Sequence, residues 1–199
     1  MIILALDTCL NACAGAVVRD GVVLSKIVEP MQRGHQERIA GMTAQLMADA
    51  HLNFPDLDRI AVTVGPGSFT GLRIGLSAAR GIGLARDIAV VGVSSLVALS
   101  LTATGPATVL LDARRGEAYF QIFAGPGQPT TAGDLLPMAI AQAAIVPGTE
   151  LISSPFVDIA ALARFGARLD PRDNPPEPNY IRDADAKPQT AARIERRPT

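Results

Sequence analysis

Short apolar runs and stretches of helical periodicity follow one another along the first hundred residues. The apolar or alternating runs predict strands at 2–7, 12–18, 22–28, 59–64 and 88–93. Apolar positions at helical spacing predict helices at 35–51, about 70–86 and 94–102. Asp20-Gly21 between the second and third strands is typical of a hairpin turn. The order β-β-β-α-β-α-β-α predicts an α/β fold, in which an antiparallel hairpin precedes parallel strands joined by crossover helices.

A second, smaller lobe is predicted after Thr104-Gly105-Pro106, which divides the chain into lobes at 1–103 and 104–199. Within the second lobe we expect strands at 108–112, 117–123 and 150–153, helices at 138–144 and about 157–169, and a loop at 125–129. From about residue 170 the chain is rich in proline and charge, which predicts an extended or disordered tail.

Small residues recur along the predicted helix 70–86. The positions four residues apart are Gly67, Gly71, Gly75, Ala79 and Gly83. The four glycines inside this helix, Gly71, Gly75, Gly81 and Gly83, together cost about 3–4 kcal/mol of helix propensity relative to alanine. Such a cost indicates that another backbone lies close to this side of the helix, either a foreign subunit or the chain's own sheet. Both alternatives stay open on the spacing alone. Ser68 or Thr70 is expected to cap the helix.

Composition limits the function classes. The 199 residues carry a net charge of −1, which does not favour binding of a nucleic-acid backbone by this chain alone. The only two cysteines, Cys9 and Cys13, have the wrong spacing for a zinc site and are expected as buried thiols in a reducing cytoplasm. No apolar run is long enough for a signal segment or a membrane span, so we expect a cytoplasmic protein.

Familiar nucleotide motifs do not fit the glycine-rich loop. A P-loop needs a lysine that is absent here, and a dinucleotide fold needs an acid after the next strand, which ends Val91-Gly92-Val93-Ser94. Asp7 and Thr8 close the first strand, where an acid can hold a metal–phosphate complex or simply tie the loop together. Both interpretations of Asp7 stay open.

No catalytic or metal-binding constellation is predicted. His35 and His51 are sixteen positions apart on one helix and cannot share a metal. Ser68 occupies a helix cap without a marked base partner, so it does not suggest a nucleophile.

Three segments carry a resemblance to a known family. They are Leu4-Ala5-Leu6-Asp7-Thr8, Gly65-Pro66-Gly67-Ser68-Phe69-Thr70-Gly71-Leu72-Arg73-Ile74-Gly75, and Pro178-Asn179-Tyr180-Ile181-Arg182 with Lys187-Pro188. The chain resembles the TsaB (YeaZ) family of the actin-like ATPase (ASKHA, ribonuclease H-like) superfamily. The resemblance implies a non-catalytic partner of TsaD in the bacterial complex that places threonylcarbamoyl on the adenosine beside the anticodon of ANN-reading tRNAs. TsaE and TsaC act in the same pathway.

The resemblance also assigns the chemistry to the partner. TsaD-like sequences continue after the equivalent strand with Asn-His-Met-Glu-Gly-His, whose histidines bind the metal. Here Ser95 and Leu99 stand at those two places. ATP and metal are therefore expected on TsaD, with none bound by this chain alone, and Asp7 and Thr8 are expected to be a degenerate nucleotide site. The alternatives are an ATP-binding phosphotransferase or ATPase using Asp7, a peptidase, and an interaction protein outside tRNA biology.

The resemblance implies that helices 35–50 and 70–86 pack against the corresponding pair in TsaD. Phe69 is expected as an apolar anchor and Arg73 as a polar contact at the rim. The isolated chain is expected to form a homodimer through the same face. The predicted partner-binding residues are His35, Ile39, Met42, Leu46, Gly67, Ser68, Phe69, Thr70, Gly71, Arg73, Gly75 and Ala79.

Overall fold

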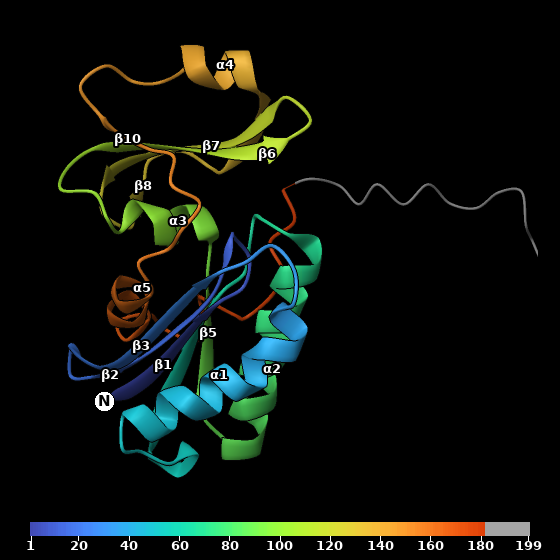
Figure 1. The fold of residues 1–199 in the computed structure, drawn as a ribbon. Helices are drawn as coiled ribbons and strands as arrows, with labels where there is room; N and C mark the ends of the chain where they lie inside the picture. Colours follow the sequence, from blue (N-terminus) through green and yellow to red (C-terminus); the bar gives the residue numbers. More distant parts are fainter. Residues whose placement is uncertain (182–199) are drawn as a thin grey trace, which may run out of the picture.

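A five-stranded mixed sheet forms the first lobe of the computed structural model, which describes residues 1–181 (Figure 1). Its strand order is β3-β2-β1-β4-β5. The strands β1 (Ile2–Asp7), β2 (Ala12–Arg19) and β3 (Val22–Pro30) are antiparallel neighbours. The strands β4 (Arg59–Thr63) and β5 (Ala89–Val93) extend the sheet parallel to β1. The predicted hairpin and parallel half are both confirmed.

Helices cover both faces of this sheet. The helices α1 (His35–Asp49) and α2 (Phe69–Arg86) lie on one face, and α5 (Ile159–Gly166) lies on the other (Figure 1). Gly75 of α2 faces Val62, whereas Gly166 of α5 faces Ala61. Because neighbouring residues of a strand point to opposite faces, these contacts place the two helices on opposite sides of β4.

The second lobe is a smaller sheet with order β10-β6-β7-β8, in which β9 also pairs with β7. Its strands are β6 (Ala107–Arg114), β7 (Glu117–Gly125), β8 (Gln128–Pro129), β9 (Asp134–Pro137) and β10 (Glu150–Ile152). The helix α4 (Met138–Ala143) covers its outer face, and α3 (Ser95–Ser100) lies between the lobes (Figure 1). A short 3-10 helix, η1 (Phe54–Asp56), precedes β4.

Two features of the second half differ from the sequence predictions. The strand β8 lies within the segment predicted as a loop, because short edge strands are formed by pairing with β7 rather than by local periodicity. The helix α5, predicted to belong to the second lobe, packs on β1 and β2 of the first lobe instead. The amphipathic sequence of α5 shows that one of its faces is apolar, but it does not show which sheet that face covers.

The segment after α5 also returns to the first lobe. The Gly92 N–H donates to the Asn174 carbonyl, and the Asn179 N–H donates to the Val64 carbonyl. The predicted tail therefore runs across the ends of β4 and β5 as far as residue 181. Arg182 and Lys187-Pro188 lie outside the described residues.

Both cysteines are buried free thiols, as expected. Among residues 1–181, no helix combines the length and hydropathy needed to cross a membrane.

Candidate functional site

The row of small residues at the start of α2 packs against the chain's own Thr8 and Cys9, which directly follow β1. A Cβ added at Gly67 would overlap the Cys9 carbonyl oxygen, and one added at Gly71 would overlap that of Thr8. A Cβ at Gly75 would lie 2.5 Å from the Thr8 hydroxyl oxygen, and Ala79 is fully buried. The prediction that these four residues meet a foreign backbone is wrong, because Thr8 and Cys9 already occupy the space beside the three glycines and Ala79 is buried within the chain.

The predicted partner contacts on α1 also face inward. His35, Ile39, Met42 and Leu46 are all buried, with exposed fractions of 7% or less. These positions form the apolar stripe by which an amphipathic helix covers a sheet, and Leu46 lies over Gly15 of β2. The prediction that these four residues form part of a partner surface is therefore also wrong.

Ser68, Phe69, Thr70 and Arg73 are exposed at the start of α2, so their predicted role stays open. The Ser68 hydroxyl accepts a hydrogen bond from the Gly71 N–H, which confirms it as the helix cap. The Arg73 guanidinium carbon lies 3.7 Å from the centroid of the Phe69 ring. Its Nε donates to the Tyr180 hydroxyl at 3.1 Å, so the segment after α5 completes an aromatic–arginine stack.

The exposed side of α2 carries its own four-residue repeat, which the sequence reasoning missed. Together with exposed residues of α1 it forms a surface that we call the outer face. Its members are Ala40, Gly41, Ala44, Phe69, Arg73, Ser77, Gly81 and Leu84. Leu84 is 88% exposed and Phe69 is 48% exposed. The signal was present in the sequence, since Phe69, Arg73, Ser77 and Gly81 recur with the same spacing as the buried row.

Asp7 and Thr8 lie beneath the surface at the end of β1. The Asp7 carboxylate is 1% exposed and accepts hydrogen bonds from the Thr63 hydroxyl at 2.6 Å and the Cys9 N–H at 3.0 Å. Burial raises the pKa of Asp7 to about 6, against the lowering effect of these hydrogen bonds. In this structure Asp7 ties the loop after β1 to β4, which is one of the two roles the sequence left open.

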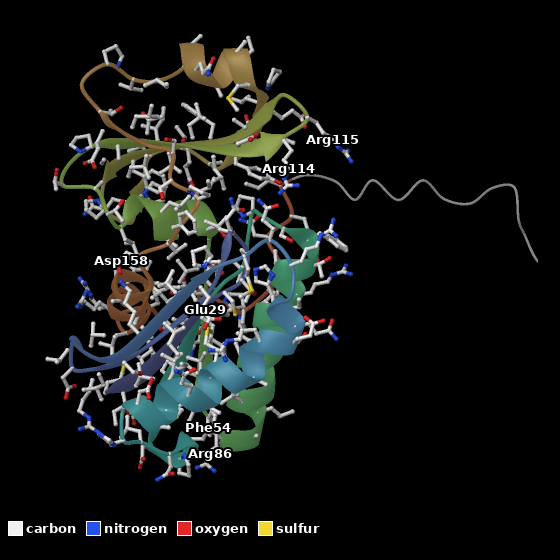
Figure 2. The ribbon with its side chains drawn as sticks, viewed as in Figure 1. Glu29, Phe54, Arg86, Arg114, Arg115 and Asp158 are labelled. Atoms are coloured by element: carbon white, nitrogen blue, oxygen red, sulfur yellow. The ribbon has the colours of Figure 1, made fainter. Side chains whose placement is uncertain are left out.

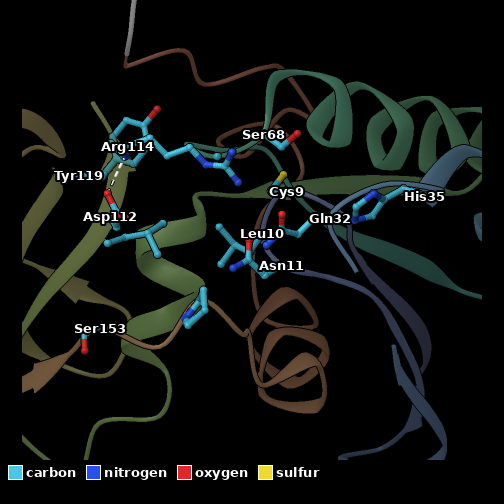
Figure 3. Close-up of a pocket in the computed structure, with 14 residues that line it drawn as sticks. Cys9, Leu10, Asn11, Gln32, His35, Ser68, Asp112, Arg114, Tyr119 and Ser153 are labelled. Carbon is cyan, nitrogen blue, oxygen red and sulfur yellow. Dashed lines mark hydrogen bonds between the residues drawn. The ribbon is translucent and has the colours of Figure 1, made fainter. Parts of the chain in front are cut away.

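A cleft of about 610 Å³ lies between the lobes (Figure 3). Its walls come from the β1–β2 turn, the starts of α1 and α2, and the β6–β7 hairpin. The polar side chains that line it include those of Asn11, Gln32, His35, Ser68, Asp112 and Arg114. Asp7 and Thr8 are not among the residues that line the cleft.

Ser95 and Leu99, which stand where the resemblance places metal-binding histidines in TsaD, are both buried in α3. Within residues 1–181, no three or more His, Cys, Asp or Glu side chains are grouped so that they could hold a metal ion.

Comparison with known proteins agrees with this architecture. A family model described as TsaD, tRNA N6-adenosine threonylcarbamoyltransferase, matches residues 23–173. An uncharacterized protein of Mycobacterium tuberculosis H37Rv is 37% identical over 199 residues, with 94% of both chains covered. The tRNA threonylcarbamoyladenosine biosynthesis protein TsaB of Escherichia coli is 38% identical over 125 residues, which cover 60% of this chain and 54% of that protein.

A solved structure supports the fold. YeaZ from Pseudomonas aeruginosa superposes with a TM-score of 0.75 at 23% identity, covering 90% of this chain and 99% of that one. The two-lobed α/β architecture that the sequence predicted is therefore shared with this structure. On the family model, the sequence relatives and this shared fold, the chain belongs to the TsaB (YeaZ) family, whose named members take part in threonylcarbamoyladenosine biosynthesis in tRNA.

Proposed function

We propose that this chain is a non-catalytic subunit that binds TsaD through the outer face of α1 and α2. In that role it is required for transfer of threonylcarbamoyl to the adenosine next to the anticodon of ANN-reading tRNAs. The observation that carries the proposal is the helical glycine Gly81, which is exposed and has no neighbouring atom within 4 Å of its added Cβ.

Gly81 needs an explanation because the chain's own packing does not supply one. A glycine inside a helix costs about 1 kcal/mol relative to alanine. The buried glycines Gly71 and Gly75 are explained by Thr8, but Gly81 faces open space. On α1, Gly41 is also exposed, and its added Cβ would approach only the flexible end of Arg38, at 3.3 Å. Two such glycines on neighbouring helices favour close approach by another molecule.

The outer face has the composition of a partner surface. Phe69 and Leu84 present large apolar side chains on either side of the small residues Ser77 and Gly81. The stacked Arg73 adds a polar group beside Phe69. Aromatic and arginine side chains are enriched among the residues that dominate binding energy, which supports Phe69 and Arg73 as anchors.

The chemistry of the complex is assigned to the partner. Asp7 is buried away from the cleft, and Leu99 has no atom that could coordinate a metal. We therefore assign ATP and metal to TsaD, with TsaE joining the larger complex and tRNA as its substrate in the cytoplasm. Without TsaD, we expect the exposed outer face to support a homodimer, since the same patch on two copies can be self-complementary.

The functional experiment is genetic complementation with a chemical readout. Cells depleted of this protein are complemented with the wild type or with Gly81→Arg, and threonylcarbamoyladenosine in bulk tRNA is measured by mass spectrometry. The proposal predicts that depletion abolishes the modification, that the wild type restores it and that Gly81→Arg does not. Normal levels in depleted cells would contradict the role in tRNA modification.

A further inference from the structure

We propose that Arg73, at the start of α2, is a receptor for a carboxylate of the partner subunit, and that Tyr180 positions it for that contact. The inference rests on the proposed function, because the carboxylate belongs to the TsaD bound at the outer face. It adds the chemistry by which the partner is recognised and a residue from the segment after α5. The side chains that carry it are Phe69, Arg73 and Tyr180.

The side chain of Arg73 is held in place by two aromatic residues. Its guanidinium carbon lies 3.7 Å from the centroid of the Phe69 ring, which covers one face of the planar group. Its Nε donates to the Tyr180 hydroxyl at 3.1 Å, and the centroids of the two rings are 5.5 Å apart. An arginine already held in one geometry loses less conformational entropy on binding, so this arrangement favours recognition of a partner group.

The terminal N–H groups of Arg73 are not used within the described chain. Among residues 1–181, neither terminal nitrogen of this guanidinium contacts a hydrogen-bond acceptor. Arg38 on α1 provides the contrast, because its guanidinium donates to both carboxylate oxygens of Glu29 on β3, at 2.7 and 2.8 Å (Figure 2). The described residues therefore supply a carboxylate to Arg38 and none to Arg73.

A carboxylate is the group that these unused donors fit. The terminal nitrogens of a guanidinium present two parallel N–H groups, which match the two oxygens of a carboxylate. On a protein partner, the side chains with this shape and charge are aspartate and glutamate. Arg73 is exposed, and Phe69 and Tyr180 are 48% and 45% exposed, so a partner side chain can reach the stack.

The position of Tyr180 is set by the residues on either side of it. The N–H of Asn179 donates to the Val64 carbonyl at 2.8 Å. Ile181 packs against the hydrophobic core, and its Cδ1 lies 3.1 Å from a Cβ added at Gly133 in the second lobe. Because these neighbours already hold the segment on both lobes, the Tyr180 hydroxyl is not needed for that purpose, which points to a role at Arg73.

The experiment measures the affinity of the full chain for the cognate TsaD by calorimetry. Arg73→Lys keeps the charge but loses the planar fork, and should weaken binding by about tenfold or more. Tyr180→Phe keeps the ring and loses the hydroxyl, and should weaken binding by about fivefold, the loss typical of one hydrogen bond. Arg19→Lys is the same change at the exposed end of β2 and should bind like the wild type. Thermal denaturation should show that all three variants are folded.

A double variant tests whether Tyr180 acts through Arg73. If Tyr180 positions the guanidinium, Tyr180→Phe should have little effect on affinity in a chain that already carries Arg73→Lys. A role of Tyr180 in the stability of the chain alone would give the same loss in both backgrounds. Such an equal loss, or wild-type affinity of Arg73→Lys, would overturn the inference.

The remaining outcomes separate this inference from its alternatives. Asp183 follows Tyr180 by three positions, and Asp183→Asn should bind TsaD like the wild type. Tighter binding by Asp183→Asn would assign Arg73 to the chain's own carboxylate instead. If the wild type does not bind TsaD, the proposed function and this inference both fail. If Gly81→Arg abolishes binding while Arg73→Lys leaves it unchanged, only this inference fails.

Discussion

The hydroxyl of Thr8 donates a hydrogen bond to the backbone carbonyl of Gly71 at 2.6 Å, and no side chain on Gly71 fits between the two residues. This contact joins the first turn of α2 to the end of β1, two segments far apart in the sequence. The small residues of α2 thus serve internal packing. The opposite side of the same helix is therefore the side available to a partner.

The first prediction concerns this contact. Gly71→Ala should lower the free energy of unfolding by about 2 kcal/mol, since overpacking a dense site costs about 1–3 kcal/mol and the Thr8 backbone has no room to move. Urea denaturation followed by circular dichroism measures the change. Gly81→Ala is the matched control, in the same helix but facing open space. It should raise stability by about 0.5–1 kcal/mol. Equal effects of the two substitutions would contradict this packing.

The second prediction concerns the pH dependence set by Asp7. Its pKa is about 6 in the folded chain and near 3.8 in the unfolded chain. Between about pH 4 and pH 6 the folded chain keeps a proton that the unfolded chain has released, so stability falls as pH rises through this window. Asp7→Asn keeps an acceptor for Thr63 and removes this titration. We expect it to stabilise the chain by up to about 3 kcal/mol above pH 6, with little effect at pH 4.

Denaturation curves at a series of pH values test this expectation. Asp49→Asn, the same change of carboxylate to amide at the exposed end of α1, is the control. If Asp7→Asn showed the same slope between pH 4 and pH 6 as the wild type, Asp7 would not be the group responsible.

The third prediction concerns the end of α5. One guanidinium nitrogen of Arg59 donates to the carbonyls of Gly166, Ala167 and Leu169, at 3.1, 3.2 and 2.7 Å. Arg59→Ala should destabilise the chain by about 2 kcal/mol, because these terminal carbonyls lose a charged donor. Hydrogen exchange should show the loss first in α5. Arg168→Ala removes an exposed arginine from the same region and should have a small effect.

The fourth prediction concerns the aromatic–arginine stack. Phe69→Ala should weaken binding to the cognate TsaD by about tenfold, as removal of a moderate anchor side chain does. It should barely change stability, because Phe69 is already 48% exposed. Calorimetric titration and thermal denaturation measure the two effects. Val22→Ala, 64% exposed at the β2–β3 hairpin, is the control. A wild-type affinity for Phe69→Ala would remove it from the partner surface.

The sequence predicted the order of elements well, because the spacing of apolar residues follows which side of each strand or helix is buried. It did not predict which side of α2 meets the sheet. Gly71 and Gly75 recur at the same spacing as Ser77 and Gly81, so periodicity alone does not distinguish the two rows. The distinction comes from Thr8, whose backbone occupies the space beside Gly71 in the folded chain.

The cleft was not predicted for a related reason. No sequence pattern singled out Arg114, and His35 was predicted as a helix residue of the partner surface. Their positions on facing walls depend on how the two lobes meet. No local pattern in the sequence records that arrangement.

The affinity of the cognate TsaD for Gly81→Arg, measured by calorimetry, tests the central claim most directly. An arginine at this position has open space, so the chain should stay folded while the outer face is blocked. Val22→Arg adds the same side chain at an exposed position of the β2–β3 hairpin and serves as the control. We predict that Gly81→Arg abolishes measurable binding and that Val22→Arg binds like the wild type. Wild-type affinity of a folded Gly81→Arg chain would contradict the assignment of the outer face to TsaD.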